Sequence, residues 1–240
     1  MPSLLRPRRL IIAIATAIAA VSLPCCVHVE VFHPDVEGTY HMGNDRPFWS
    51  YEGPVQHAKL PQDVKPVGQD TPSWCWAAAS SMLLQSQGVD VSQEDIVKRA
   101  YGDLRDSGGK SPLMVQALSG TFKAGDGKPV KLEAHRADGF PHNGLELVSS
   151  IDEGRPFIVD IGYFKKDPKG NRAEAYAAHS LLVVGVTYQR QGNEIKILSL
   201  DTIDPSYRMI RETNPNYDPH QKMQASEFYS IQGTLGVYRR

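Results

Sequence analysis

The chain has 240 residues, 41% hydrophobic and 22% charged, which suits one globular domain of ordinary size with a sizeable core. Its 26 basic and 27 acidic residues give a formal net charge of −1. Without three arginines in its first nine residues, 23 basic residues remain against 27 acidic ones, a net charge of −4. The composition therefore excludes the basic footprint of a nucleic-acid-binding protein, and no nucleic-acid partner is expected.

Residues 1–26 have the pattern of a signal peptide. The three arginines precede an uncharged run over residues 10–21, which at 12 residues is too short to span a bilayer comfortably. The run ends near Cys25 and Cys26, and a cysteine at this place resembles a bacterial lipoprotein cleavage site, although Pro24 departs from that pattern. The sequence predicts export, as a secreted, periplasmic or membrane-anchored lipoprotein. Lipidation at Cys25 or Cys26 and plain secretion both stay open.

Residues 27–60 contain scattered glycines and prolines with weak periodicity. This favours an extended linker, or a segment wrapped on the surface of the domain that follows. Whether residues 27–68 act as an inhibitory pro-segment stays open at this point. The folded domain is expected to cover residues 61–240.

Helices come first in that domain. The first is expected from Cys75 to about Gln87, with Ser73 as its N-cap and Gly88 as its stop. Small and apolar residues on one face predict that this helix is buried. A second helix is expected after the N-cap Ser92, and a third over about residues 112–118.

Strands follow the helices. A helix is expected from Gly144 to Gly154, then strands over 156–162, 179–188 and 194–200, the last two joined by a hairpin-length turn. A late β-rich stretch covers about residues 228–238. Helices followed by antiparallel strands predict an α+β fold, with an N-terminal helical part packed on an antiparallel sheet.

Cys75 is the only cysteine outside the predicted processing site. An exported protein rarely keeps a lone thiol unless that thiol is used or deeply buried. At the start of a helix, the positive end of the helix dipole favours the thiolate, the form that attacks carbonyl carbon. The structural alternative is that Cys75 is a small hydrophobic residue in the core, without a catalytic role.

A cysteine nucleophile needs a base, and the base needs an orienting group. His179 begins a buried strand, and Asp201 ends the next strand, where a hairpin would return it towards His179. Asp204, before a proline, is the alternative third member. Gln69 can donate its amide N–H to the oxyanion of a tetrahedral intermediate. Each of these residues also has a structural reading as a turn former or a hydrogen-bonded residue.

These residues resemble those of the papain-like cysteine peptidases, in which a glutamine precedes a Cys-Trp pair at the same spacing as Gln69 and Cys75. Four segments most resemble the bacterial branch of secreted and effector proteases and bacteriocin leader peptidases: residues 74–78, 151–159, 178–185 and 201–205. The resemblance implies a papain-like fold in which Cys75 is the nucleophile, His179 the general base and acid, and Gln69 the oxyanion donor. An Asp-Pro pair is typical of that branch and favours Asp204, whereas strand register favours Asp201, the residue we place in the triad.

The resulting hypothesis is an exported cysteine peptidase that hydrolyses peptide bonds through a covalent acyl-enzyme, without metal or cofactor. Its expected partner is a protein or peptide substrate, and a lipid at the N-terminus would attach it to a membrane. Two alternatives keep the same residues: an acyltransferase or transglutaminase-like enzyme, and a non-catalytic surface domain that binds peptides. The sequence does not identify the substrate or the oligomeric state.

Overall fold

The computed structural model describes residues 53–141, 144–166, 172–191 and 194–240. The predicted signal peptide and all but the end of the predicted linker lie outside these residues. The described helices are α1 (Cys75–Ser86), α2 (Gln93–Tyr101), α3 (Ser111–Leu118), α4 (Gly144–Asp152) and the short α5 (Tyr207–Ile210), with a 3₁₀ helix at Ala225–Ser230. The strands are β1 (Val55–Lys59), β2 (Gly120–Lys123), β3 (Pro129–Asp138), β4 (Phe157–Lys166), β5 (Arg172–Gln191), β6 (Glu194–Ile203), β7 (His220–Gln224) and β8 (Ile231–Arg239).

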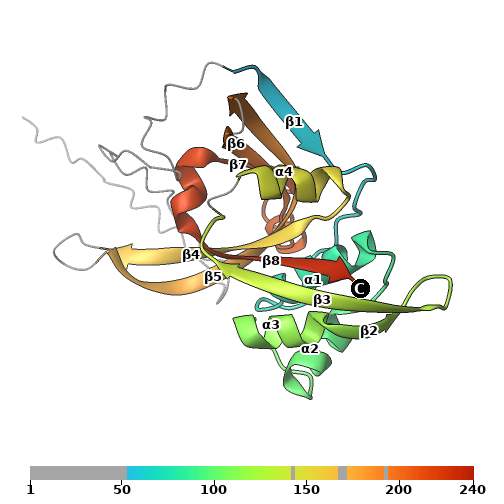
Figure 1. Cartoon of the computed structure of the whole chain (residues 1–240). Coiled ribbons are helices and arrows are strands. Elements are labelled where there is room, and N and C mark those ends of the chain that lie inside the picture. Colours follow the sequence, from blue (N-terminus) through green and yellow to red (C-terminus); the bar gives the residue numbers. More distant parts are fainter. Residues whose placement is uncertain (1–52, 142–143, 167–171, 192–193) are drawn as a thin grey trace, which may run out of the picture.

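All eight strands belong to one antiparallel sheet, in the order β2-β3-β8-β4-β5-β6-β7. β1 lies off this path and pairs with β5, so that Lys59 lies opposite Gly185. β5 and β6 form a hairpin whose register shifts twice, between Val183 and Gly185 and between Thr187 and Tyr188. Figure 1 shows the long β4 and β5 extending together to one side, away from helices α1 to α3.

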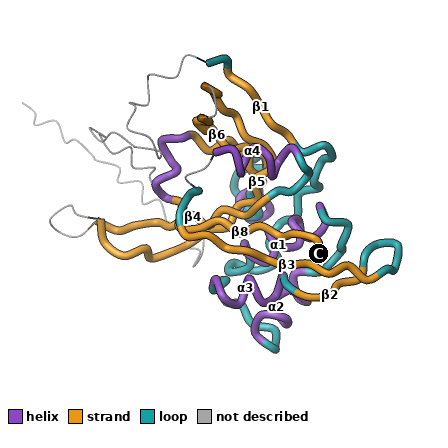
Figure 2. The backbone as a smooth tube through the Cα atoms, viewed as in Figure 1, coloured by secondary structure: helices purple, strands orange, loops and turns teal. Residues whose placement is uncertain are grey.

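The helices divide into two groups around this sheet. α1 packs against β4 and β5 and also contacts α2 and α3, whereas α4 packs against β1, β5 and β6. Figure 2 shows the same division, with α2 and α3 beside β2 and β3 and α4 beside β1 and β6. None of the described helices is long and apolar enough to cross a membrane.

α1 is buried almost along its whole length, as its alanine-rich face predicts. Ala77, Ala78 and Ala79 have no exposed surface, and neither do Met82 and Leu83 one turn later. Alanine lets a helix approach its neighbours closely, and burial of the longer side chains stabilises that contact by about 25 cal/mol per Å² of apolar surface. The core therefore fixes the helix that begins at Cys75.

The expected α+β class with an antiparallel sheet is confirmed, and Ser92 accepts a hydrogen bond from the Asp95 N–H at 3.1 Å as the N-cap of α2. The expected cap of α1 is wrong: its N-cap is Trp74, and no side chain of the cap residue bonds the helix. Ser73 instead uses its backbone N–H to bond Asp106, a residue from a distant loop.

The start of the domain also differs from the expectation. Residues 55–59 fall in the stretch expected to be an extended linker or a segment wrapped on the domain surface, but they form β1 and pair with β5 from Val55 opposite Gln189 to Lys59 opposite Gly185. Four of the five β1 residues are exposed and only Ala58 is buried, which explains why the hydrophobic pattern of this strand is faint.

Candidate active site

His179 on β5 and Asp204, the residue directly after β6, form a buried pair. The His179 Nε2 lies 2.8 Å from the Asp204 Oδ1, and the two residues are 6% and 7% exposed. The other ring nitrogen of His179, Nδ1, is buried and has no hydrogen-bond partner within the described part of the chain. Buried polar atoms are nearly always paired, so an unpartnered imidazole nitrogen marks a position where a reacting group can be received.

Asp204 is held by more donors than the histidine alone. Its Oδ1 also accepts from the backbone N–H of Ser206 at 2.8 Å and from the Ser206 hydroxyl at 2.6 Å, while its Oδ2 accepts from the Tyr217 hydroxyl at 2.8 Å. Burial by itself would raise the pKa of Asp204, but the hydrogen bond and charge of His179, with the two bonds from Ser206, lower it overall. Asp204 is therefore an anion that fixes the ring of His179.

The predicted hydrogen bond from His179 to Asp201 is wrong. Asp201 lies opposite Gly185, six residues from His179 along β5, and its Oδ2 is 2.6 Å from the His57 Nε2. Its Oδ1 is 3.2 Å from the Lys222 Nζ. The hairpin register therefore carries Asp201 to a different site, and Asp204 takes the place beside the imidazole.

Gln69 begins the loop that leads to Cys75. Its amide Nε2 donates to the carbonyls of Thr71 and Pro72, each at 2.9 Å, and its Oε1 is buried without a partner among the described residues. The side chain is 1% exposed and is thus held tightly in the loop. In this arrangement both amide protons are bonded to the loop, so donation to a substrate requires exchange of one of these bonds.

The loop of Gln69 touches the segment that carries Asp204. The backbone N–H of Gln69 donates to the carbonyl of Pro205 at 2.8 Å, and Asp70 forms an ion pair with Arg208 at 2.9 Å. These contacts bring the start of α1 beside the His179–Asp204 pair, although more than a hundred residues separate them in the sequence. Three of the four predicted positions, Gln69, Cys75 and His179, thus lie on segments that the fold brings together.

Cys75 is the first residue of α1 and is 4% exposed. No acidic residue lies in the first turn of this helix, so the partial positive charge at its N-terminus is not neutralised from within the helix. This helix end by itself favours a thiolate at position 75, whereas burial of the side chain opposes it.

Comparison with known proteins gives the family. The model of the Peptidase C39 like family matches residues 61–236, which is most of the chain. The chain belongs to this family. It is therefore a cysteine peptidase, and the expected bacterial papain-like class is confirmed.

Solved structures similar to this C39-like peptidase share little sequence with it. They include a C39-like peptidase from Bacillus anthracis (13% identity, 76% of this chain and 98% of that chain covered, TM-score 0.47). Another is procathepsin B S9 from Trypanosoma congolense (8% identity, 74% and 73% covered, TM-score 0.48). A third is the peptidase domain of Streptococcus ComA, an ABC transporter involved in quorum sensing (16% identity, 74% and 98% covered, TM-score 0.42). No curated protein matches the sequence.

The C39-like peptidase also has a clamp beside Cys75 that sequence patterns do not indicate. The Asp106 Oδ1 accepts from the Thr71 hydroxyl at 2.6 Å and from the Ser73 N–H at 3.0 Å. The indole N–H groups of Trp74 and Trp76 donate to the carbonyls of Arg105 and Ser107, at 2.8 and 3.0 Å. The two residues that flank Cys75 are therefore tied to one exposed loop. The Asp106 carboxylate of this loop lies at the start of the helix, where its negative charge opposes the positive end of the dipole.

A second buried carboxylate supports the strand of His179. Asp160 on β4 accepts from the Ser180 hydroxyl at 2.6 Å and from the Arg136 Nη1 at 3.1 Å. Burial raises the pKa of Asp160, and the bonds and charges around it, including Ser180 and Arg136, only partly oppose that effect. Because Ser180 follows His179 directly, this contact fixes β5 at the residue next to the imidazole.

Proposed function

We propose that this C39-like peptidase hydrolyses peptide bonds with Cys75 as nucleophile, His179 as general base and acid, Asp204 as the orienting group and Gln69 as an oxyanion donor. The observation that carries the proposal is the buried His179 ring, which is bonded to Asp204 through Nε2 and leaves Nδ1 without a partner among the described residues. That Nδ1 lies within reach of the Cys75 sulfur is a prediction of the proposal.

In the first step, His179 holds the proton of Cys75, and the thiolate attacks the carbonyl carbon of the scissile bond. The carbonyl oxygen becomes an oxyanion, which the Cys75 backbone N–H and the Gln69 amide stabilise once Gln69 exchanges one loop carbonyl for it. As the C–N bond breaks, the imidazolium gives its proton to the amine, which leaves, and an acyl-enzyme remains. His179 then removes a proton from water, the hydroxide attacks the thioester, and the proton returns to the Cys75 sulfur as the acid departs.

The role of Asp204 is to keep the ring in one orientation through both proton transfers. An imidazole whose Nε2 is bonded to a buried carboxylate exposes only Nδ1 to the thiol, and the carboxylate stabilises the imidazolium. Ser206 and Tyr217 keep Asp204 in place, so the imidazole does not have to reorganise during the reaction.

The test is a comparison of the wild-type chain with Cys75→Ala and Cys75→Ser, checked by circular dichroism for an unchanged fold. We expect the wild type to cleave a casein-derived fluorogenic peptide mixture and iodoacetamide to label Cys75, with both lost in the alanine variant. Cleavage that persists in Cys75→Ala would refute the assignment. Products in which an added amine replaces water would instead point to acyl transfer.

We also propose that the enzyme is exported. The support is the basic start and the uncharged run over residues 10–21, which precede Cys25 and Cys26. Mass spectrometry of the protein from its own membranes and medium tests this proposal. A mature N-terminus at Cys25 or Cys26 with added lipid mass gives the lipoprotein form, an unlipidated shortened chain gives the secreted form, and an intact Met1 in the cytoplasm overturns export.

A further inference from the structure

A second concave site lies on the sheet, around Asp201. A cavity of about 360 Å³ is lined by residues from four strands: His57, Lys59, Val184, Asp201, Thr202, His220, Gln221 and Lys222. The lining holds two lysines and two histidines but one carboxylate, in a chain that carries more acidic than basic residues overall.

Strand register explains why the basic groups gather there. His57 and Lys59 are two residues apart on β1, and His220 and Lys222 are two residues apart on β7. Because side chains in a strand alternate between faces, each pair projects from one face of the sheet. Lys59, Gly185, Asp201 and Lys222 are successive direct neighbours across β1, β5, β6 and β7, so the two lysines flank the aspartate.

Two local features create the hollow between the basic pairs. Val184 is the extra residue of the register shift between β5 and β6, so these strands are not regularly paired at that point. Gly185, the next residue, carries no side chain, and a Cβ there would lie 2.7 Å from the Asp201 Oδ2. The missing side chain lets Asp201 lie across β5 and reach His57 on β1.

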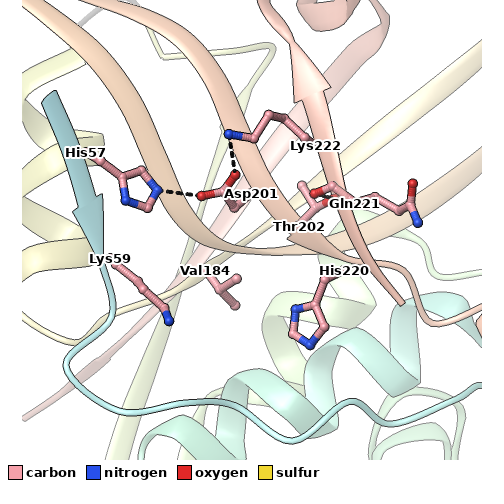
Figure 3. A pocket seen from close by; sticks show the side chains of 8 residues that line it. All are labelled: His57, Lys59, Val184, Asp201, Thr202, His220, Gln221 and Lys222. Atoms are coloured by element: carbon pink, nitrogen blue, oxygen red, sulfur yellow. Dashed lines mark hydrogen bonds and ion pairs between the residues drawn. The ribbon is translucent and has the colours of Figure 1, made fainter. Parts of the chain in front are cut away.

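Both carboxylate oxygens of Asp201 already have a basic partner. One carboxylate oxygen is bonded to His57 at 2.6 Å and the other to Lys222 at 3.2 Å. Among the described residues the Lys59 ammonium forms an ion pair only with Asp63, at 3.5 Å and with an Asp63 side chain that is 91% exposed, and such a surface pair contributes little. Figure 3 shows the Lys59 and His220 side chains projecting from opposite sides towards the open space below Val184.

We propose that this cavity is a second substrate-binding site of the peptidase, which receives the carboxylate groups of an acidic peptide segment between Lys59 and His220. The proposal rests on the proposed function for its choice of a peptide. The position of the cavity along the chain supports this choice. Asp201 on β6 lines the cavity, and Asp204, three residues later, contacts His179. Three residues of extended chain span about 10 Å, so the two sites lie close together. One extended substrate can therefore contact both sites.

The experiment measures binding apart from cleavage, in full-length protein with Cys75→Ala. A fluorescent peptide of alternating glutamate and serine is titrated by anisotropy, against the same peptide with glutamine for glutamate. We expect the glutamate peptide to bind more tightly, and its affinity to fall as salt rises from about 50 to about 300 mM, because charges in an open cavity are screened. Inorganic phosphate serves as the competitor.

Four substitutions in that background locate the site. Lys59→Gln and His220→Gln should each weaken binding by about three- to tenfold, whereas Lys65→Gln, an exposed lysine outside the cavity, should not. Asp201→Asn should act in the opposite direction and tighten binding, because it removes the one negative charge of the lining.

The remaining outcomes count against the proposal. Equal affinity for the two peptides, or unchanged affinity in both Lys59→Gln and His220→Gln, would overturn it. Phosphate that binds in the cavity while the glutamate peptide does not would replace a peptide site with a free-anion site. Because Cys75→Ala removes the proposed nucleophile, none of these results depends on whether the wild-type chain is proteolytic.

Discussion

Replacing Asp204 tests which part of the support of His179, the proposed general base, comes from charge and which from orientation. Asparagine can keep the Oδ1 acceptor for His179 and Ser206 and place its amide against the Tyr217 hydroxyl, which can accept as well as donate. Asp204→Asn therefore removes the charge and leaves the ring orientation. Asp204→Ala removes both and leaves buried donors without acceptors.

The magnitudes follow from the kind of bond that is lost. A hydrogen bond to a charged group contributes about 1.5–3 kcal/mol and a neutral one about 0.5–1.5 kcal/mol, so loss of the charge costs about 1–1.5 kcal/mol. At 1.36 kcal/mol for each factor of ten, kcat of Asp204→Asn should fall about tenfold. Asp204→Ala also frees the ring to rotate, and its kcat should fall by about two to three orders of magnitude.

The assay is kcat on a short fluorogenic peptide, corrected for the fraction of Cys75 that reacts with an active-site alkylating reagent. Asp201→Ala is measured beside the two variants, because Asp201 is the other aspartate at the end of β6. The decisive quantity is the loss of kcat, which should be at least about thirtyfold greater for Asp204→Ala than for Asp201→Ala. Equal losses, or a fully active Asp204→Ala, would refute the assignment of Asp204.

The remaining predictions concern charge and packing near the same strands. Asp106→Asn keeps an acceptor for the loop but removes a negative charge near Cys75. The rise of the Cys75 alkylation rate with pH should therefore move to lower pH by about half a unit. An unchanged pH dependence would assign Asp106 a purely structural role. Because the pKa of Asp204 is lowered on folding, its stabilisation is present above the unfolded pKa of about 3.9 and is lost as pH falls towards the folded value. Urea unfolding should therefore show a steeper loss of stability below about pH 4 in the wild type than in Asp204→Asn, and parallel curves would contradict the lowered pKa. Gly185→Ala should cost about 1–2 kcal/mol in the same unfolding assay, because its Cβ would displace the Asp201 carboxylate, and a neutral substitution would show that the carboxylate moves freely.

The sequence predicts the first half of the site better than the second. Cys75 at the start of a buried helix could be recognised because helix propensity, apolar spacing and a stop at Gly88 agree with one another. The capping of that helix could not, because Asp106 reaches Ser73 from a loop 33 residues away. Long-range contacts of this kind leave no periodic signal in the sequence.

The error over Asp201 arose from the length of β6. The sequence pattern predicts an end near Leu200, but the strand continues to Ile203. Near the turn Gln191 lies opposite Glu194, and farther along the hairpin Leu182 lies opposite Ile203. Continued by three more residues, this register brings His179 opposite position 206, close to Asp204 and beyond the reach of Asp201. Counting outwards from the turn predicts the partner better than judging where the strand ends.

Strands at the edge of the sheet were harder to recognise than those at its centre. β4 and β5 carry runs of buried Ile, Leu and Val, whereas the sequence pattern does not predict the edge strands β2 and β7, nor β3, which lies between β2 and β8. β7 has one buried residue among five, and β2 one among four. An edge strand packs few side chains in the core, so its hydrophobic alternation is too short to distinguish it from a loop.

Asp201 and Asp204 show why the surroundings of a carboxylate, more than its residue type or place in the chain, decide its function. Asp204 is buried and accepts from a histidine, a backbone N–H and two hydroxyl groups, so its charge and position are both fixed. Asp201 is partly exposed, and its partners are the side chains of His57 and Lys222, both on other strands and both open to solvent. A group that orients an imidazole through two proton transfers must not reorient with it, and only Asp204 meets that condition. Asp201 instead is bonded to two of the four basic side chains around a cavity, which leaves Lys59 and His220 to select what enters it.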